Sequence, residues 1–328
     1  MYELVLPLAT SGAAVGLLDA TVRASTVLIL AGLGELITQR SGVLNLGVEG
    51  MLLFSALGSF IAVVATGSYV LGFAVGVIIG VLAAGLHAFL SVSLNSNQVI
   101  SGLMITLLGI GATTFFGQPY TGETIQGMPK TTLPLVGQYL VQVPVVGEVL
   151  FRNAATDFLA IALVPITWYF LFRTNLGLEI LSVGEAPEAA DTAGVRVDRL
   201  RYLSTMLGGA LAGLAGAHLS LALTGLWSAG MAAGRGWIAI ALVFVAQWKP
   251  FRMLAIAYVF AVLDALTIRI QAIDVGSAPI VEFLTHPTIM AMYPYIATVL
   301  VLVLASRGTL KERLGGPSAL AQPYRRLE

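Results

Sequence analysis

The stretch Ser182–Arg201, SVGEAPEAADTAGVRVDRLR, interrupts a chain that is otherwise almost continuously apolar. It holds seven of the chain's 17 acidic and 17 basic residues. Pro187 suits the first turn of a helix and Gly194 suits the position just past a helix end, so the sequence predicts a short helix over Pro187–Ala193. A polar helix between two membrane spans has no role inside the bilayer. Two interpretations stay open: it docks on a water-soluble partner, or it is an ordinary solvated loop.

The docking interpretation rests on the charge and size of the side chains in this helix. Glu185 and Glu188 stand at its start, where the helix dipole favours negative charge. Four alanines, at 186, 189, 190 and 193, give the helix a small and smooth face. The residues predicted to take part in docking are Gly184, Glu185, Pro187, Glu188, Ala189, Ala190, Ala193 and Gly194.

The composition is that of an integral membrane protein. Hydrophobic residues make up 57% of the 328 residues and charged residues 10%, with a mean hydropathy of +0.90. Soluble domains carry about 25% charged residues. The long Leu/Val/Ala-rich segments favour helices over barrel strands. We therefore expect an all-α polytopic bundle of about nine to ten transmembrane helices, some broken, forming one domain over residues 1–328.

The order of apolar segments gives the expected crossings, with residues 1–20 as a short interfacial helix or a tenth crossing. Spans are predicted at 22–39, 46–66, 69–94, 97–117, 156–173, 200–225, 236–248, 251–273 and 288–306. The seventh is too short to cross about 30 Å as a helix. If residues 174–200 are cytoplasmic, twelve of the 17 basic residues lie inside, which places the N-terminus outside and the tail, 307–328, in the cytoplasm.

Two further features bear on packing and partners. The long external loop, 118–155, is either a docking surface or a plain cap over the bundle. Small residues recur at intervals of four in the third and sixth spans, which lets helix backbones approach closely. Such rows fit packing within one subunit or a dimer interface. Their members are Gly72, Gly76, Gly80 and Ala84, and Gly209, Gly213 and Ala217.

Catalytic and metal-binding motifs are missing from the sequence. No lysine follows a glycine as a P-loop requires, so the chain is not expected to hydrolyse ATP by that motif. The three histidines are far apart, and no G-x-S-x-G is present. The absence of cysteine excludes disulfides and thiolate sites, and a net charge of zero gives no case for nucleic-acid binding. We expect no enzyme, cofactor or metal.

Two glycine-rich segments interrupt the apolar pattern, 35–51 (ELITQRSGVLNLGVEGM) and 227–239 (WSAGMAAGRGWIA). Irregular backbone at membrane depth is tolerated only inside protein or along a cavity, and paired interruptions in transporters mark a midplane site. The alternative is that their polar groups only satisfy the backbone. Mid-span Asp264 is either functional or paired with another helix. The predicted substrate path comprises Asn45, Glu49, Phe54, Asn97, Gln98, Thr106 and Trp237.

Four stretches together resemble a known family. They are RSGVLNLGVEGM at Arg40–Met51, NQVISG at Asn97–Gly102, VGEAPEAADTAGV at Val183–Val195, and GRGWIA at Gly234–Ala239 followed by QWKP at Gln247–Pro250. The chain resembles the permease subunits of bacterial ABC importers in the branched-chain amino-acid/simple-sugar permease family, and within it the nucleoside branch. It departs from the family at Ala186 and Thr106, where asparagine is frequent, and the second change touches a ligand-facing position.

The resemblance implies a multi-pass subunit of the cytoplasmic (inner) membrane that works by alternating access. The helix at Pro187–Ala193 would couple to a cytoplasmic ABC ATPase, and the external loops would meet an extracytoplasmic substrate-binding protein. A second, related permease would complete the path, as a heterodimer or a homodimer within membrane lipid. The implied solute is a nucleoside or purine-like compound. Alternatives are a simple-sugar or riboflavin-like permease, or an ion-coupled secondary transporter, which would need charged residues in several spans.

Overall fold

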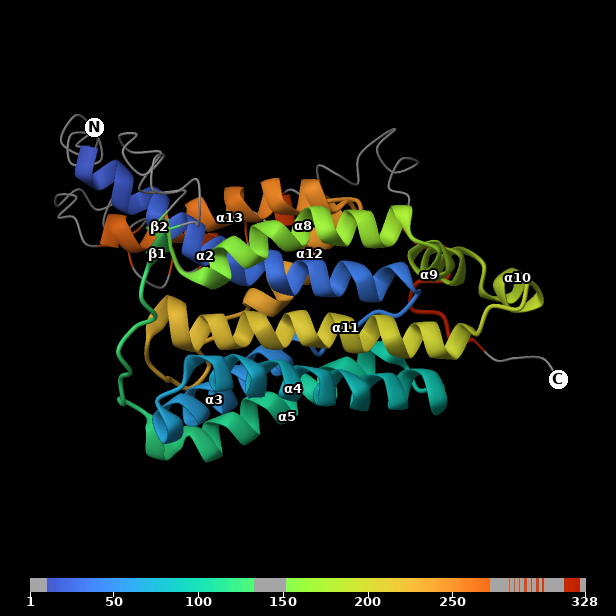
Figure 1. The fold of residues 1–328 in the computed structure, drawn as a ribbon, viewed down its shortest axis with the longest axis horizontal. Coiled ribbons are helices and arrows are strands. Elements are labelled where there is room, and N and C mark those ends of the chain that lie inside the picture. The colour runs from blue at the N-terminus through green and yellow to red at the C-terminus, as the bar shows by residue number, and fades with distance from the viewer. Residues whose placement is uncertain are drawn as a thin grey trace.

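The computed structural model describes residues 11–132, 152–271 and 316–324, with single positions between 283 and 303. These parts form a bundle of helices that run side by side along the longest axis (Figure 1). The helices are α2 Ser11–Arg40, α3 Val48–Thr66, α4 Tyr69–Ala88, α5 Gln98–Gly117, α8 Ala155–Arg173, α9 Asn175–Glu185, α10 Pro187–Thr192, α11 Val197–His218, α12 Arg235–Val245 and α13 Pro250–Gln271. A two-stranded antiparallel sheet, β1 Thr131–Thr132 with β2 Arg152–Asn153, is the one sheet in the described part.

Three short stretches extend the helices irregularly. π-Helical turns at Phe89–Ser93 (η1) and Leu219–Thr224 (η3) continue α4 and α11, and a 3₁₀ turn at Gln118–Tyr120 (η2) continues α5. The π turns are wider than the α-helix and occur most often at functional or strained positions. η3 leads directly into the second glycine-rich segment, so the helix is already unwinding where that segment begins.

Helix α2 is the centre of the bundle. In its apolar window 89% of the residues are buried, against 22% for the α4 span and 33% for the α5 and α8 spans. Leu30, Leu33 and Leu36 are fully buried in a core shared with α3, α11, α12 and α13. A helix that is apolar all round and buried all round belongs in the interior. α4, α5 and α8 therefore form the periphery, where leucines and phenylalanines face outward.

Helix α4 crosses α11 with their backbones in contact. A Cβ added to Gly80 would meet the carbonyl of Gly209 and lie 2.7 Å from the Gly213 Cα. A Cβ added to Gly213 would lie 3.0 Å from the Val77 Cα. The two predicted rows of small residues thus pack against each other within this subunit. The prediction of packing is confirmed, and these rows are not available to a dimer interface.

Seven helices of the described residues are long and apolar enough to cross a membrane. They match the predicted spans from 22–39 to 200–225 and 251–273, and α12, with 11 residues, is as short as expected. Residues 11–20 are not a separate interfacial helix, because they continue α2 without a break. The predicted span 288–306 and residues 1–10 lie outside the continuously described residues, as do residues 133–151 of the loop 118–155.

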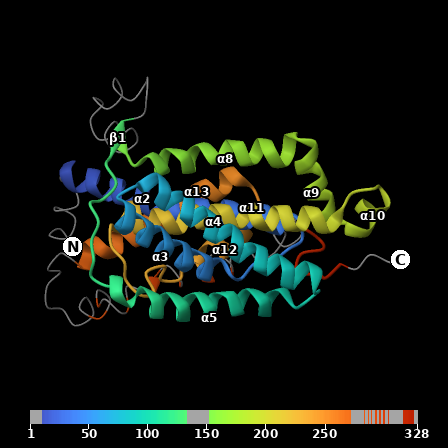
Figure 2. The same cartoon turned by 60° about the horizontal axis from the view of Figure 1, so that its bottom comes forward.

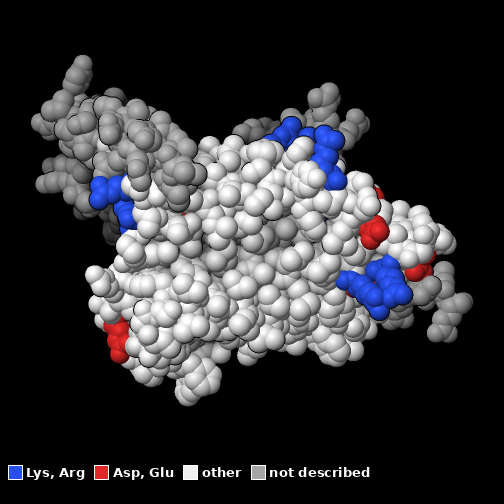
Figure 3. Space-filling model, viewed as in Figure 1, with Lys and Arg blue, Asp and Glu red and all other residues white. Residues whose placement is uncertain are grey.

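The charged side chains lie at the two ends of the bundle, and the flank that is visible between them is uncharged (Figure 3). α9 and α10 lie at one end, together with the described part of the tail, 316–324 (Figure 1). Basic residues expected outside gather at the other end: Arg23 and Lys130 both pair with Asp19 there. Arg235 is an exception, because it lies at the start of α12 and pairs with Asp264 of α13.

Helix α9 was not expected within the segment 174–200, which was predicted to be a loop around one short helix. Thr174 caps it by accepting the amide of Gly177 at 3.1 Å. Its buried positions, Gly177, Ile180, Val183 and Gly184, share one face. The end of this segment was also misplaced, because α11 begins at Val197 and Arg201 is only 1% exposed.

Candidate functional site

The first glycine-rich segment breaks the chain between α2 and α3, over residues 41–47. Side chains from three helices hold its backbone. The Leu44 amide donates to Gln98 Oε1 at 2.7 Å, and its carbonyl lies 3.2 Å from His87 Nε2. The Asn45 amide donates to Glu35 Oε1 at 3.1 Å. The irregular backbone is therefore satisfied by buried polar groups rather than by water.

The same segment is closed on its α5 side. Thr106 Oγ1 donates to the Leu46 carbonyl at 3.0 Å, and Asn45 Oδ1 accepts the Gly47 amide at 2.9 Å. A Cβ added to Gly102 would lie 2.6 Å from the Leu46 amide nitrogen. α5 can pack this closely against the segment only because no side chain intervenes.

The second segment enters the bundle from the opposite end and stops at α12 (Figures 1 and 2). Glu49, in the first turn of α3, accepts the Gly234 amide at 2.8 Å and the Gly236 amide at 2.7 Å, one with each carboxylate oxygen. Gly234 can take its φ of +78° because it has no side chain. The N-termini of α3 and α12 therefore meet at one carboxylate, which both helix dipoles favour.

A chain of polar contacts joins the turn that follows α12 to α2. Trp248 Nε1 donates to Gln39 Oε1 at 2.7 Å, and Gln39 Nε2 donates to Glu35 Oε1 at 2.9 Å. Glu35 Oε2 has no hydrogen-bond partner among the described residues. On the other side of α12, Arg235 pairs with Asp264 at 2.9 Å, so the alternative that Asp264 pairs with another helix is confirmed.

The predicted docking helix is present as α10, Pro187–Thr192, with Ala193 as its C-cap and Gly194 at a φ of +90°. Glu188 and Ala189 are exposed, and Ala190 is the one buried residue of the helix. Gly184, just before it, packs against the Arg40 carbonyl, with the carbonyl carbon 2.9 Å from an added Cβ. α10 thus stands out from the end of the bundle while its base is fixed to the end of α2 (Figure 2).

One protein family matches most of the chain. The family described as "Branched-chain amino acid transport system / permease component" matches residues 17–307. This chain belongs to that family. It is a transport subunit of the cell membrane and not an enzyme, as the sequence predicted.

Relatives of this permease carry the names of two solute classes. A protein of Haloferax volcanii with the provisional name glucose ABC transporter permease protein TsgC13 is 56% identical, covering 95% of this chain and 98% of its own. The guanosine ABC transporter permease protein NupQ of Bacillus subtilis is 33% identical, covering 94% and 96%. The nucleoside ABC transporter permease protein NupC of Lactococcus lactis is 31% identical, covering 85% and 89%. No solved structure matches this permease.

The residues predicted for the substrate path fall into three groups in the permease. Asn45, Glu49, Gln98 and Thr106 are buried, at 5% exposure or less, and all four bond to the backbone of the broken segments. Phe54 and Trp237 are half-buried. Asn97 is exposed and caps α5 by accepting the amides of Val99 and Ile100. The first group therefore holds the backbone of the broken segments in place, and any contact with a solute would be a second role for the same side chains.

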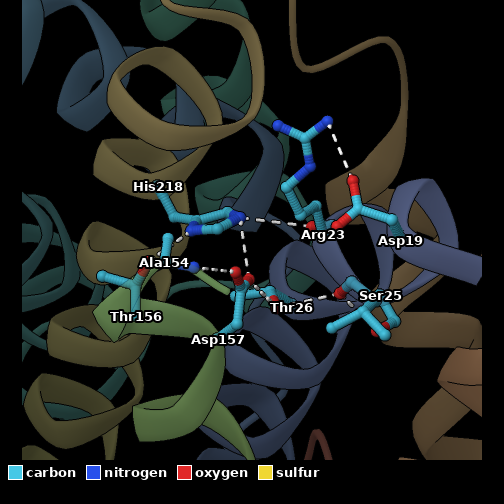
Figure 4. A network of polar contacts seen from close by, with 9 residues as sticks. Asp19, Arg23, Ser25, Thr26, Ala154, Thr156, Asp157 and His218 are labelled. Carbon is cyan, nitrogen blue, oxygen red and sulfur yellow. Dashed lines mark hydrogen bonds and ion pairs between the residues drawn. The ribbon is translucent and has the colours of Figure 1, made fainter. Parts of the chain in front are cut away.

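A second buried polar site was not predicted from the sequence (Figure 4). Asp157 of α8 accepts Thr26 Oγ1 of α2 at 2.6 Å and lies 3.6 Å from His218 Nε2 of α11. His218 Nδ1 is 2.7 Å from Thr156 Oγ1. Asp157 and His218 are 1% and 0% exposed, so this network ties three helices together inside the end of the permease opposite α10. An acidic residue at the start of a span was its one signal in the sequence.

Proposed function

We propose that this permease forms, together with a second permease, the translocation path of an ATP-driven importer. The observation that carries the proposal is the meeting of α3 and α12 at Glu49. In transporters, the ends of interrupted helices meet in this way around a solute site near the membrane midplane. The proposed path residues are Asn45, Glu49, Phe54, Asn97, Gln98, Thr106 and Trp237.

In this proposal α10 is the docking element for a cytoplasmic ATPase. Its exposed Glu188 and Ala189 would contact the ATPase. The close packing of Gly184 against the Arg40 carbonyl would transmit movement of α10 to α2 and to the segment at 41–47. The opposite end, including the loop 118–155, would receive an extracytoplasmic substrate-binding protein. Alternating access then follows from two states biased by nucleotide and by the loaded binding protein.

The second permease is proposed to be a related but different chain. Two relatives from Bacillus subtilis, NupQ and NupP, are both named guanosine ABC transporter permease proteins. Two from Haloferax volcanii, TsgC13 and TsgB13, are both named for glucose. Pairs of related permeases in one organism support a heterodimer, and a homodimer is the alternative.

The proposed solute is uncharged and carries a hydroxylated sugar ring, which nucleosides and simple sugars share. The sequence motifs favour a nucleoside, whereas the relative at 56% identity favours a sugar. An ion-coupled transporter is less well supported. Its candidate charges are already engaged, because Asp264 is paired with Arg235 and Glu49 caps α12.

Uptake of labelled guanosine and of labelled glucose by right-side-out vesicles, with and without ATP trapped inside them, tests this proposal. ATP-dependent uptake of either solute, with competition only within its own class, would support the importer and decide the solute. Uptake that persists without ATP and follows an ion gradient would contradict the importer. Uptake of a charged amino acid and of neither neutral solute would contradict the proposed solute class.

A further inference from the structure

The described part of the C-terminal tail, residues 316–324, is built into the end of the bundle beside α10. Its Ala319 amide donates to the Gly184 carbonyl at 2.9 Å, and its Ala321 amide donates to the Gly42 carbonyl at 3.1 Å. Gly316 lies against Trp248, where an added Cβ would be 2.6 Å from the ring. These contacts join the tail to the base of α10 and to the first broken segment.

Side chains fix the same segment further. Glu185 Oε2 accepts both the amide and the hydroxyl of Ser318, at 3.3 and 3.0 Å. Arg201, buried at the start of α11, donates to the Gln322 carbonyl at 3.1 Å, and its guanidinium lies 5.9 Å from the centre of the Tyr324 ring. Since Ala319 is only 5% exposed, the tail is packed as firmly as a core element over part of its length.

A groove of about 400 Å³ runs between this tail segment and α10. One wall is Glu185–Ala189, and the other is formed by Ser318, Ala319, Gln322, Pro323 and Tyr324. Two carboxylates, Glu185 and Glu188, and no lysine or arginine are among the described residues that line it. The groove lies at the charged end of the molecule, beyond the uncharged flank that lipid tails would cover (Figure 3).

We propose that the tail segment 316–324 is the second half of the ATPase-docking surface, and that the groove receives an arginine or lysine side chain of the ATPase. The inference deepens the proposed function and rests on it. The two carboxylates favour a cationic side chain, and the position beside the exposed face of α10 brings the groove within reach of any protein that docks there. The ATPase would then contact a surface joined directly to Gly42 as well as to α10.

The chain contains no cysteine, so single thiols report on this surface without background. We would place them at Gln322→Cys on the tail and at Ala189→Cys on α10, which keeps both carboxylates, and label membranes before and after the ATPase is washed off and rebound. We expect both thiols to react in washed membranes and both to react roughly tenfold more slowly with the ATPase bound.

The outcomes separate the inference from the proposed function. Protection at Ala189→Cys without protection at Gln322→Cys would overturn the tail's role and leave α10 as the docking element. Protection at neither position would overturn docking itself. A Gln322→Cys thiol that is already unreactive in washed membranes would show that lipid or another part of the chain covers the groove, and would also overturn the inference.

The choice of a cationic occupant has its own test. Glu188→Arg should weaken rebinding of the ATPase by roughly tenfold, because it places a positive charge in the groove that repels the positively charged side chain of the ATPase. Glu179→Arg is the matched control, since Glu179 is an exposed acidic residue of α9 outside the groove. Equal rebinding by the wild type and both variants, or equal loss in both variants, would overturn the cationic contact.

Discussion

At the scale of single residues, Glu49 joins the two halves of the proposed path, because one carboxylate caps α12 from the first turn of α3. Glu49→Leu would leave the amides of Gly234 and Gly236 buried without acceptors. Each hydrogen bond to a charged group is worth about 1.5–3 kcal/mol. We expect the variant to lose on the order of 3 kcal/mol of stability and to lose uptake, as measured by thermal unfolding in detergent and by vesicle transport.

Glu49→Gln is the control for that prediction, since its single carbonyl oxygen can still accept one amide while its NH₂ faces the other. An intermediate loss is expected. If Glu49→Leu unfolds at the wild-type temperature and transports normally, the carboxylate neither stabilises the start of α12 nor belongs to the substrate path.

The polar residues of the broken segments were identified from the sequence, but their partners were not. Asn45, Gln98 and Thr106 stand out because polar groups are rare in such spans. Which backbone groups they bond depends on α4 and α5 packing against residues 41–47, which no local pattern encodes. The Asp157–His218 contact was missed for the same reason, because its members are 61 positions apart (218 − 157).

At the scale of elements, the α4–α11 crossing depends on absent side chains. Gly80→Ala would drive a methyl group into the Gly209 carbonyl and the Gly213 backbone. We expect a loss of about 1–3 kcal/mol, as for other overpacked interiors. Gly85→Ala, on the same helix, has open space around its Cβ and should gain up to about 1 kcal/mol from helix propensity. Thermal unfolding of the two variants tests this prediction. Equal changes in stability for Gly80→Ala and Gly85→Ala would contradict the close contact between α4 and α11.

The base of α10 is a second contact between elements. Gly184→Leu would push α9 away from the Arg40 carbonyl and so separate α10 from the end of α2. We expect the ATPase to remain bound while ATP-driven uptake falls by roughly tenfold, because the coupling between the sites is lost. Ser182→Leu adds the same side chain at an exposed position of α9 and should transport normally. Normal uptake by Gly184→Leu would remove this contact from the coupling route.

The elements themselves were largely predictable. Long apolar segments predicted most span ends to within a few residues, although α2 begins at Ser11 rather than at 22, and Pro187 and Gly194 predicted both ends of α10. α9 was missed because its polar residues hid the spacing of Ile180, Val183 and Gly184. The predicted span 46–66 starts two residues early, because α3 begins at Val48. Residues 41–47 are irregular, since Gly42 adopts a φ of +85° and Asn45 Oδ1 accepts the Gly47 amide.

At the scale of the whole molecule, the charge distribution predicts an orientation in the membrane. α10 should face the cytoplasm and the end that carries Glu123 should face outward. A thiol-labelling reagent that cannot cross membranes should modify Glu123→Cys in intact cells and Arg199→Cys only in inside-out vesicles. The reverse pattern would exchange the proposed docking partners of the two ends.

The contact between α4 and α11 also limits how this permease can move. The two backbones are in direct contact there, so no side chains lie between α4 and α11 that could change rotamer and let the helices shift. We expect α4 and α11 to move together as one rigid unit when the permease changes between its two states. The displacement would fall on α12, which is short and is held at its start by hydrogen bonds to Glu49. The glycines of α4 and α11 therefore determine which part of the permease stays rigid when it changes state.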